Sequence, residues 1–264
     1  MTEQLTKSPE LQGKPNWAEL IEHALTVPGS MGNTYNRFYD YSFFNQVLLY
    51  LQGVREPVAT YKRWQSLGRQ VQKGSKAKTI MRPMIKKTAK DDGTEESRLL
   101  GFKYVNCLFT LSETEGDDLP PPEVRDWEPS LAMRTLDIEE VPFQSLDGNT
   151  AGYSIDRKLA INPVAPYPMK TLCHEMAHIV LGHTKPENHQ EYLQHRGVHE
   201  FQAEATAYLL MNELDCLEFM DAAESRAYIQ LWLRQQRPDD ADIRKVFGAT
   251  EKILKAGRPE RSDK

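Results

Sequence analysis

Three consecutive prolines, Pro120 to Pro122, interrupt the chain near its middle and constrain how it can fold. Proline has no amide hydrogen and a fixed φ, so this run cannot continue a helix and favours an extended spacer. We therefore predict a linker over residues 116–128. It would join two domains, residues 1–115 and 129–264, each long enough to bury its own core.

The basic charge of the first domain is concentrated in one segment. Residues 61–90 contain ten Lys or Arg and no Asp or Glu, a charge of +10, which leaves −15 for the rest of a chain whose net charge is −5. Basic side chains neutralise phosphates and aromatic rings stack on unpaired bases. Composition alone fits two interpretations, a single-stranded nucleic-acid surface or a solvated face with Trp64 in the core. The candidate DNA contacts are Lys62, Arg63, Trp64, Arg69, Lys73, Lys76 and Lys78.

Apolar spacing and turn residues predict an α+β fold for the chain, with a small α+β unit in the first domain. The predicted helices there cover residues 17–25, 35–51 and 61–67, and the predicted strands cover residues 78–84 and 99–111. A polar turn at residues 90–96 separates the two strands, which is the pattern of a hairpin.

The second domain is predicted to be mainly helical with a small sheet. Its predicted turn and strand cover residues 151–162, and its predicted helices cover residues 169–182, 198–214, 221–236 and 241–256. The apolar strand at residues 159–162 lies just before the first of these helices. We expect that an extended peptide could add to it as a further strand.

The sequence His174-Glu175-Met176-Ala177-His178 lies within the predicted helix 169–182. At about 100° per residue, His174 and His178 lie about 40° apart and one turn above each other, so both imidazoles can reach one ion. Glu175 can then contact a metal-bound water. This arrangement is typical of zinc metalloendopeptidases of the HExxH type, in which two His bind Zn²⁺ and the Glu is the general base.

A catalytic zinc site needs a third protein ligand and an open fourth position. The candidates are His183, Glu200 and Glu204, of which His183 faces away from His174 unless Gly182 breaks the helix. Glu200 and Glu204 are four residues apart, so both lie on one helical face and one of them can support the other's metal contact. Donors to the transition state could be Tyr153, His199 or Tyr208, and the sequence does not choose among them.

Two segments of the second domain carry a family resemblance. Residues 171–178 (TLCHEMAH) and 203–210 (AEATAYLL) resemble the ImmA/IrrE and ArdC-like zincin peptidases. In those families a Glu on the helix after HExxH supplies the third ligand. The resemblance therefore implies a zincin-like fold and selects Glu204 as the third ligand.

The first domain resembles the single-stranded-DNA-binding domain of ArdC antirestriction proteins. The similarity lies in residues 41–52 (YSFFNQVLLYLQ), 64–77 (WQSLGRQVQKGSKA) and 108–114 (LFTLSET). It implies a zinc peptidase joined to a single-stranded-DNA-binding domain, with an antirestriction or mobile-element role and a protein or peptide substrate. Two alternatives stay open: a non-catalytic DNA-coating protein with structural zinc, and an ImmA-like protease that cleaves a repressor.

The N-terminal sequence has no apolar segment of signal-peptide length, and no run of about 18 apolar residues suggests a membrane span. The three cysteines, Cys107, Cys173 and Cys216, are far apart and odd in number. This favours neither a disulfide framework nor a Cys-rich zinc site. We expect a cytoplasmic protein that does not contact a membrane.

Overall fold

The structure, a computed structural model of the chain, describes residues 16–25, 41–89, 95–119, 126–144, 150–188, 195–235 and 238–259. It divides into two compact units, residues 1–20 with 34–122 and residues 21–33 with 123–264. The division at residue 122 falls within the predicted linker, although Pro120 to Pro122 themselves lie outside the described residues. Helix α1 (Trp17–Ala24), predicted at residues 17–25, contains the other division. The domain limits at residues 115 and 129 stay a prediction.

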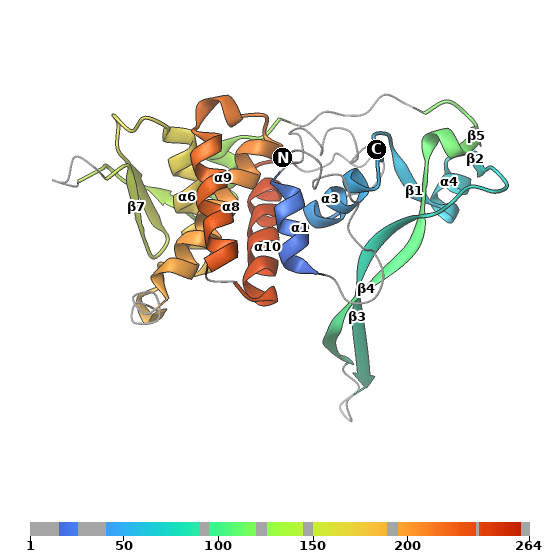
Figure 1. Cartoon of the computed structure of the whole chain (residues 1–264), viewed down its shortest axis with the longest axis horizontal. Helices are drawn as coiled ribbons and strands as arrows, with labels where there is room; N and C mark the ends of the chain where they lie inside the picture. The colour runs from blue at the N-terminus through green and yellow to red at the C-terminus, as the bar shows by residue number, and fades with distance from the viewer. Residues whose placement is uncertain are drawn as a thin grey trace. The chain divides into compact units, whose positions relative to one another are not determined.

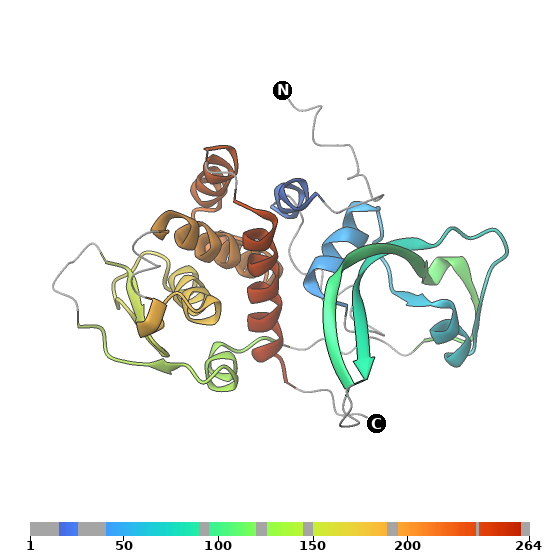
Figure 2. The ribbon, with the colours of Figure 1, turned by 90° about the horizontal axis from the view of Figure 1, so that it is seen from below.

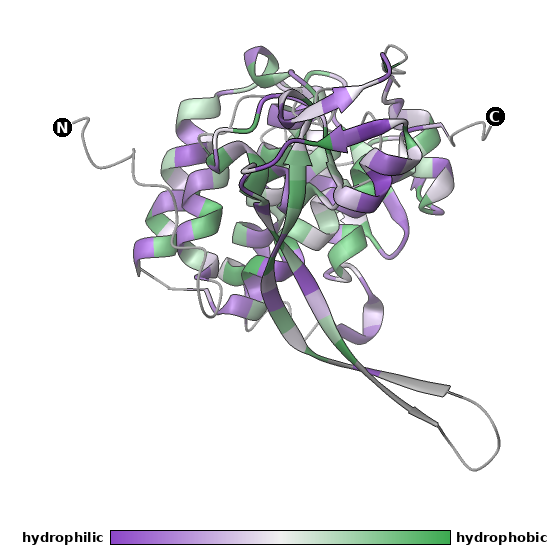
Figure 3. Ribbon diagram, turned by 90° about the vertical axis from the view of Figure 1, so that its right-hand side faces the viewer, coloured by the Kyte–Doolittle hydropathy of each residue, from purple (hydrophilic) through white to green (hydrophobic). Residues whose placement is uncertain are grey.

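The first unit is built on a three-stranded antiparallel sheet in the order β1-β4-β3. Its strands are β1 (Val58–Thr60), β3 (Lys78–Ala89) and β4 (Glu95–Thr110). The last two pair along their whole length, from Lys78 opposite Leu108 to Ala89 opposite Glu95, and form a long twisted hairpin (Figures 1 and 3). The hairpin prediction is confirmed, but both strands extend beyond the predicted apolar segments because backbone pairing continues through polar residues.

Helix α3 (Phe43–Leu51) packs against β3 and supplies core side chains to this unit (Figure 2). Ser42 caps it, since its hydroxyl accepts a hydrogen bond from the Asn45 amide at 3.3 Å. The Asn45 side chain in turn bonds both the N–H and the carbonyl of Met81, at 2.9 and 3.0 Å, and so ties the helix to the sheet. The predicted helix 35–51 is confirmed from residue 43, and residues 35–40 lie outside the described part.

A second, two-stranded sheet pairs β2 (Arg69–Val71) with β5 (Thr114–Gly116). It follows helix α4 (Tyr61–Ser66), predicted at residues 61–67, and the short 3-10 helix η1 (Leu111–Glu113) precedes β5. Gly68 enters β2 with φ 73°, a left-handed backbone conformation that L side chains rarely adopt. Glycine therefore meets a backbone requirement here. Neither strand was predicted, because three residues are too few to show alternation.

The second unit contains a three-stranded sheet in the order β6-β8-β7. It follows helix α5 (Pro129–Thr135) and consists of β6 (Glu139–Glu140), β7 (Gly152–Ile155) and β8 (Lys158–Ile161). β8 pairs with β7 antiparallel along its whole length and with β6 in parallel only at Lys158 and Leu159. The expectation that a peptide adds along residues 159–162 stays a prediction, and among the described strands β7 is an edge of this sheet.

Four long helices complete this unit (Figures 1 and 2). They are α6 (Pro168–Leu181), α8 (Arg196–Glu213), α9 (Ala222–Gln235) and α10 (Asp240–Ala256), with the 3-10 helices η2 (Pro186–Asn188) and η3 (Leu217–Phe219) between them. All four long helices were predicted to within two residues at each end. α8 contacts the other three and is buried around its circumference from Phe201 to Glu213, as expected of a central helix.

The burial of α8 includes polar side chains. Gln202 is 1% exposed and Glu204 is 7% exposed, among alanine and leucine neighbours. A buried amide or carboxylate is costly unless it is hydrogen-bonded. Gln202 bonds His183, which follows α6, and Asp242 on α10, whereas Glu204 bonds His174 and Lys170 on α6 and Ser225 on α9. Among the described residues no helix has the length and apolar character needed to cross a bilayer.

Candidate functional site

Helix α6 presents His174 and His178 on one face, as predicted. It begins with Pro168 at its first position and ends at Gly182, whose φ of 81° is left-handed. The two imidazole rings lie 4.8 Å apart between centroids, at 65° to each other. Both rings therefore direct their Nε2 atoms toward the adjoining helix α8.

Three ligand atoms converge between α6 and α8. His174 Nε2 lies 3.1 Å from His178 Nε2, and Glu200 Oε2 lies 3.4 and 3.7 Å from these two nitrogens. Ligands placed about 2.0–2.2 Å from a tetrahedral zinc are separated by roughly 3.3–3.5 Å. The group His174, His178 and Glu200 therefore has the donor set and the size to hold one metal ion. Among the described residues it includes no fourth protein ligand.

Glu204, which the resemblance selected as third ligand, meets the other edge of the His174 ring. Its Oε2 lies 3.1 Å from His174 Nδ1 and 2.7 Å from Lys170 Nζ, and its Oε1 accepts a hydrogen bond from Ser225. Metal-binding histidines commonly donate their second N–H to a carboxylate in this way. The geometry thus groups Glu200 with the two imidazoles and places Glu204 behind one of them.

These carboxylates shift the protonation of the site. Burial acts to lower the pKa of His174, but the hydrogen bonds with Glu200 and Glu204 outweigh it and raise the pKa to about 9. Burial acts to raise the pKa of Glu204, but the His174 hydrogen bond and the Lys170 charge lower it to about 2. At neutral pH, with no metal bound, His174 is therefore an imidazolium beside an ionised Glu204.

Glu175, the predicted general base, is 8% exposed and receives a hydrogen bond from a residue that the sequence analysis did not identify. The hydroxyl of Ser154 on β7 donates to Glu175 Oε2 at 2.6 Å. This bond fixes one carboxylate oxygen and leaves the other to accept a proton. No sequence pattern marks Ser154, because its role depends on how β7 packs against α6.

His183 turns back toward the site because the left-handed Gly182 ends α6, and its amide bonds the His178 carbonyl at 3.0 Å. Its Nδ1 lies 3.0 Å from His178 Nδ1, on the edge of that ring away from Glu200. Burial and the nearby His178 lower the pKa of His183 to about 3, so the ring is neutral at pH 7. His183 is thus a neighbour of the metal-ligand group and does not belong to it.

The three candidate transition-state donors differ in their surroundings. The Tyr208 hydroxyl is buried and donates to the Leu25 carbonyl at 3.1 Å, while the His199 ring stacks on His183 at 4.2 Å. The half-buried Tyr153 ring packs against Phe143 at 5.6 Å. A fourth aromatic group, Tyr228 on α9, was missed. Burial raises the pKa of its hydroxyl, and the charges of Glu200 and Glu204 act in the same direction.

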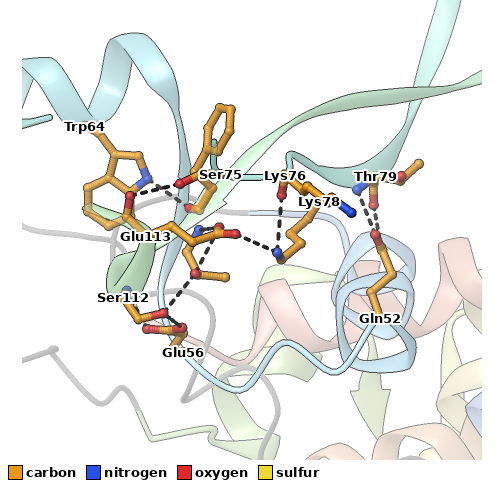
Figure 4. A network of polar contacts seen from close by, with 11 residues as sticks. Gln52, Glu56, Trp64, Ser75, Lys76, Lys78, Thr79, Ser112 and Glu113 are labelled. Carbon is orange, nitrogen blue, oxygen red and sulfur yellow. Dashed lines mark hydrogen bonds and ion pairs between the residues drawn. The ribbon is translucent and has the colours of Figure 1, made fainter. Parts of the chain in front are cut away.

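In the first unit, the predicted base-stacking role of Trp64 needs correction. The side chain is 0% exposed, and its indole N–H donates to the Phe109 carbonyl at 2.9 Å (Figure 4). It therefore anchors α4 to β4. In this fold no face of the ring is accessible to a base.

Two of the predicted DNA-binding cations are engaged within the unit. The Arg69 guanidinium donates to Thr114 Oγ1 at 2.8 Å and to the carbonyls of Thr114, Gly116 and Asp117. Lys78 pairs with Glu113 at 2.9 Å (Figure 4). Both side chains thus hold β5 and its approach in place.

The other four predicted contacts, Lys62, Arg63, Lys73 and Lys76, are exposed. Within the described part of the chain, only Arg63 among them has a side-chain partner, the hydroxyl of Ser66 at 3.4 Å. Tyr61, directly before Lys62, is 42% exposed. It is an aromatic ring in this segment that solvent can reach.

Comparison with known proteins agrees with this architecture. Residues 1–109 match the family described as the N-terminal domain of anti-restriction factor ArdC. The metal-free crystal structure of the antirestriction ArdC protein from the R388 plasmid aligns with 92% of this chain and 95% of its own, at 19% identity and a TM-score of 0.54. Residues 1–109 are therefore similar to the ArdC N-terminal domain, and the whole chain is similar in fold to the R388 ArdC protein. The Mn(II)-bound structure of the R388 ArdC protein aligns at 19% identity, with 92% and 96% of the two chains covered and a TM-score of 0.49. No curated protein sequence matches the chain.

The ArdC likeness confirms the predicted family resemblance and the α+β fold. The match at the level of sequence is limited to residues 1–109. At 19% identity the structural match carries the fold of the second unit and not its chemistry. The function of the metal-ligand group must therefore be argued from its own geometry.

Proposed function

We propose that the second unit is a metal-dependent peptidase and that the first unit binds single-stranded DNA, in an antirestriction role. The observation that carries the peptidase assignment is the triangle of His174 Nε2, His178 Nε2 and Glu200 Oε2, with sides of 3.1 to 3.7 Å, beside the buried Glu175. We propose Glu200 in place of Glu204 as the third ligand.

Two imidazoles and one carboxylate are the donors of a catalytic zinc site, and we propose Zn²⁺ as the resident ion. When bound, it would polarise a peptide carbonyl and lower the pKa of a bound water. Three protein ligands leave a coordination position for that water, whereas structural zinc sites are filled by four. This difference favours a catalytic role over a structural one.

The residues around the ion have separate tasks. Glu175 accepts a proton from the attacking water, and the Ser154 hydroxyl orients its carboxylate through the 2.6 Å hydrogen bond. Glu204 orients His174 through Nδ1, and Lys170 balances the charge of Glu204. β7 carries Ser154 and has an edge to which an extended substrate can add, which would bring a peptide carbonyl next to Glu175.

The test is hydrolysis of a denatured protein substrate by the zinc-loaded chain and by Glu175→Gln. We expect the variant to retain one zinc per chain and to lose activity, because an amide cannot accept the proton. Glu187→Gln, which changes an exposed carboxylate in η2, serves as the matched control and should match wild type. Equal activity of Glu175→Gln would refute the role of Glu175. Zinc binding without any hydrolysis would favour structural zinc, and cleavage of only one repressor-type substrate would favour a regulatory protease.

DNA binding is supported by the ArdC N-terminal match and by the exposed cations Lys62, Arg63, Lys73 and Lys76 beside Tyr61. Each phosphate contact contributes about −0.7 to the slope of log K against log salt for single strands. Replacing all four cations with Gln should therefore reduce the slope by up to about 3 and weaken binding. The control replaces four exposed cations of the second unit with Gln, namely Arg134, Lys158, Lys185 and Lys252. An unchanged slope in the first variant would show that these cations form only a solvated face.

A further inference from the structure

A chain of buried polar groups leads from His178 to helix α10. His178 Nδ1 lies 3.0 Å from His183 Nδ1, His183 Nε2 lies 2.8 Å from Gln202 Oε1, and Gln202 Nε2 donates to Asp242 Oδ1 at 2.8 Å. His178, His183 and Gln202 are 5%, 8% and 1% exposed. Buried polar groups are normally hydrogen-bonded, and these contacts supply partners for His178 Nδ1, both ring nitrogens of His183 and the Gln202 amide.

The carboxylate at the far end determines the direction of each bond. A carboxylate can only accept, so Gln202 turns its NH₂ toward α10 and its carbonyl oxygen toward His183. That oxygen can only accept, so His183 carries its proton on Nε2. Its Nδ1 is then a lone pair, which accepts the proton of His178 Nδ1. His178 is left with a lone pair on Nε2, the atom that faces His174 and Glu200.

We propose that His183, Gln202 and Asp242 are positioning residues that impose the metal-binding tautomer on His178. This inference rests on the proposed metal site and adds to it the reason why His178 presents the correct nitrogen. A neutral imidazole places its proton on either nitrogen, and only the form protonated on Nδ1 can bind a metal through Nε2. The chain of bonds makes that choice before any ion arrives.

Local contacts hold this chain of hydrogen-bonded groups in place. The left-handed Gly182 turns His183 back against α6, and the His199 ring stacks on His183 at 4.2 Å with an interplanar angle of 21°. Asp242 is held by its place in the first turn of α10, where its backbone N–H bonds Asp239 Oδ1 at 2.8 Å. Lys245 Nζ lies 3.7 Å from the Asp242 oxygen that accepts from Gln202.

The reversed arrangement is disfavoured at each step. A Gln202 amide turned the other way would set its carbonyl against the Asp242 carboxylate. It would also move the His183 proton to Nδ1, facing the proton of His178 Nδ1. His178 could then escape the clash only by protonating Nε2, which removes the lone pair from the metal position. Metal affinity is therefore linked to an amide two contacts away from the metal ligand His178.

The first measurement is the imidazole ¹⁵N spectrum of the metal-free full chain, with long-range couplings to the ring protons to identify the protonated nitrogen. We expect His183 to be protonated on Nε2 and His178 to carry a proton on Nδ1. A His183 protonated on Nδ1 would overturn the proposal. Because no metal is present, this result is independent of whether the chain is a metalloprotein.

The second measurement compares Gln202→Glu with Gln202→Leu, by Zn²⁺ competition against a chromophoric chelator. The Glu side chain keeps an acceptor toward His183 and the Leu side chain removes it, while both change the contact with Asp242. We expect Gln202→Leu to bind zinc about 10- to 100-fold more weakly and Gln202→Glu to bind within a few fold of wild type. Equal zinc affinities in the two variants would refute the proposed role of Gln202 in setting the His178 tautomer. A wild type that binds no zinc would refute the proposed metal site and leave the spectrum to decide the tautomer.

Discussion

The pair Glu200 and Glu204 offers a direct test of which carboxylate binds the metal. Both lie on α8, one turn apart, and can be changed identically to Gln. Glu200 Oε2 faces the Nε2 atoms of both histidines at 3.4 and 3.7 Å, whereas Glu204 Oε2 faces His174 Nδ1 at 3.1 Å. The same substitution should therefore remove a ligand in one case and weaken a supporting contact in the other.

The expected magnitudes follow from these positions. Zinc binding worth roughly 10–16 kcal/mol over four ligands gives about 2.5–4 kcal/mol for each. At about 1.4 kcal/mol per tenfold change, Glu200→Gln should weaken zinc binding roughly 100- to 1000-fold. Glu204→Gln keeps an oxygen for the His174 N–H but leaves the Lys170 charge unbalanced, so we expect a loss of about 10- to 100-fold.

The assay is chelator competition with Zn²⁺ at fixed pH, accompanied by thermal unfolding of each metal-free variant to show that it folds. Glu200→Gln should bind at least about tenfold more weakly than Glu204→Gln. The reverse order would show that Glu204 is the third ligand and that the triangle involving Glu200 does not describe the loaded site. Equal losses would refute the assignment of separate roles to the two carboxylates.

Four further predictions rest on other contacts. The pKa of metal-free His174 is about 9, so zinc must displace a proton from this ring below that pH. Zinc affinity should therefore rise about tenfold per pH unit between pH 7 and 9 and then level off. Calorimetry in buffers of different ionisation enthalpy should show about one proton released at pH 7. The same raised pKa stabilises the metal-free fold fully below about pH 6.5, and this contribution should disappear as the pH rises through 9. Ser154→Ala should lower kcat by about tenfold with zinc content unchanged, since it removes a hydrogen bond to the Glu175 carboxylate, and an unaltered kcat would contradict that role. Arg69→Met should lower the free energy of unfolding of the first unit by about 2–3 kcal/mol, measured with urea, because it removes the hydrogen bonds to Thr114. The control Lys73→Met should change this free energy by no more than about 0.5 kcal/mol. Equal stabilities of the two variants would show that the Arg69 contacts contribute nothing.

The sequence predicted those parts of the molecule whose information is local. The period of α6 and the HExxH spacing were sufficient to place His174 and His178 on one face with Glu175 beside them, and the structure has that helix. The short strands β2 and β5 could not be predicted, because their stability comes from the Arg69 hydrogen bonds across 45 or more residues. Trp64 was ambiguous for a related reason, since α4 is too short to show which of its faces is buried.

The functional groups that sequence analysis missed are all defined by tertiary contact. Ser154 reaches Glu175 from a strand, and Asp242 reaches Gln202 from α10, 40 residues away. Neither residue type nor spacing marks them. The order of Glu200 and Glu204 is a similar case, since residues four apart lie on the same face and periodicity cannot separate them. What separates them is the edge of the His174 ring that each carboxylate meets.

His174 and His178 use their Nδ1 atoms for hydrogen bonds with different partners. Each ring directs Nε2 toward the same point and uses Nδ1 for a bond on the far side. For His174 the partner is the ionised Glu204, whereas for His178 it is the neutral ring of His183. A carboxylate attracts a proton to the ring that it contacts, and a neutral imidazole brings no such charge. The proton that zinc displaces at neutral pH should therefore come from His174. Glu204→Gln should reduce this proton release without abolishing it, because Glu200 also raises the pKa of His174.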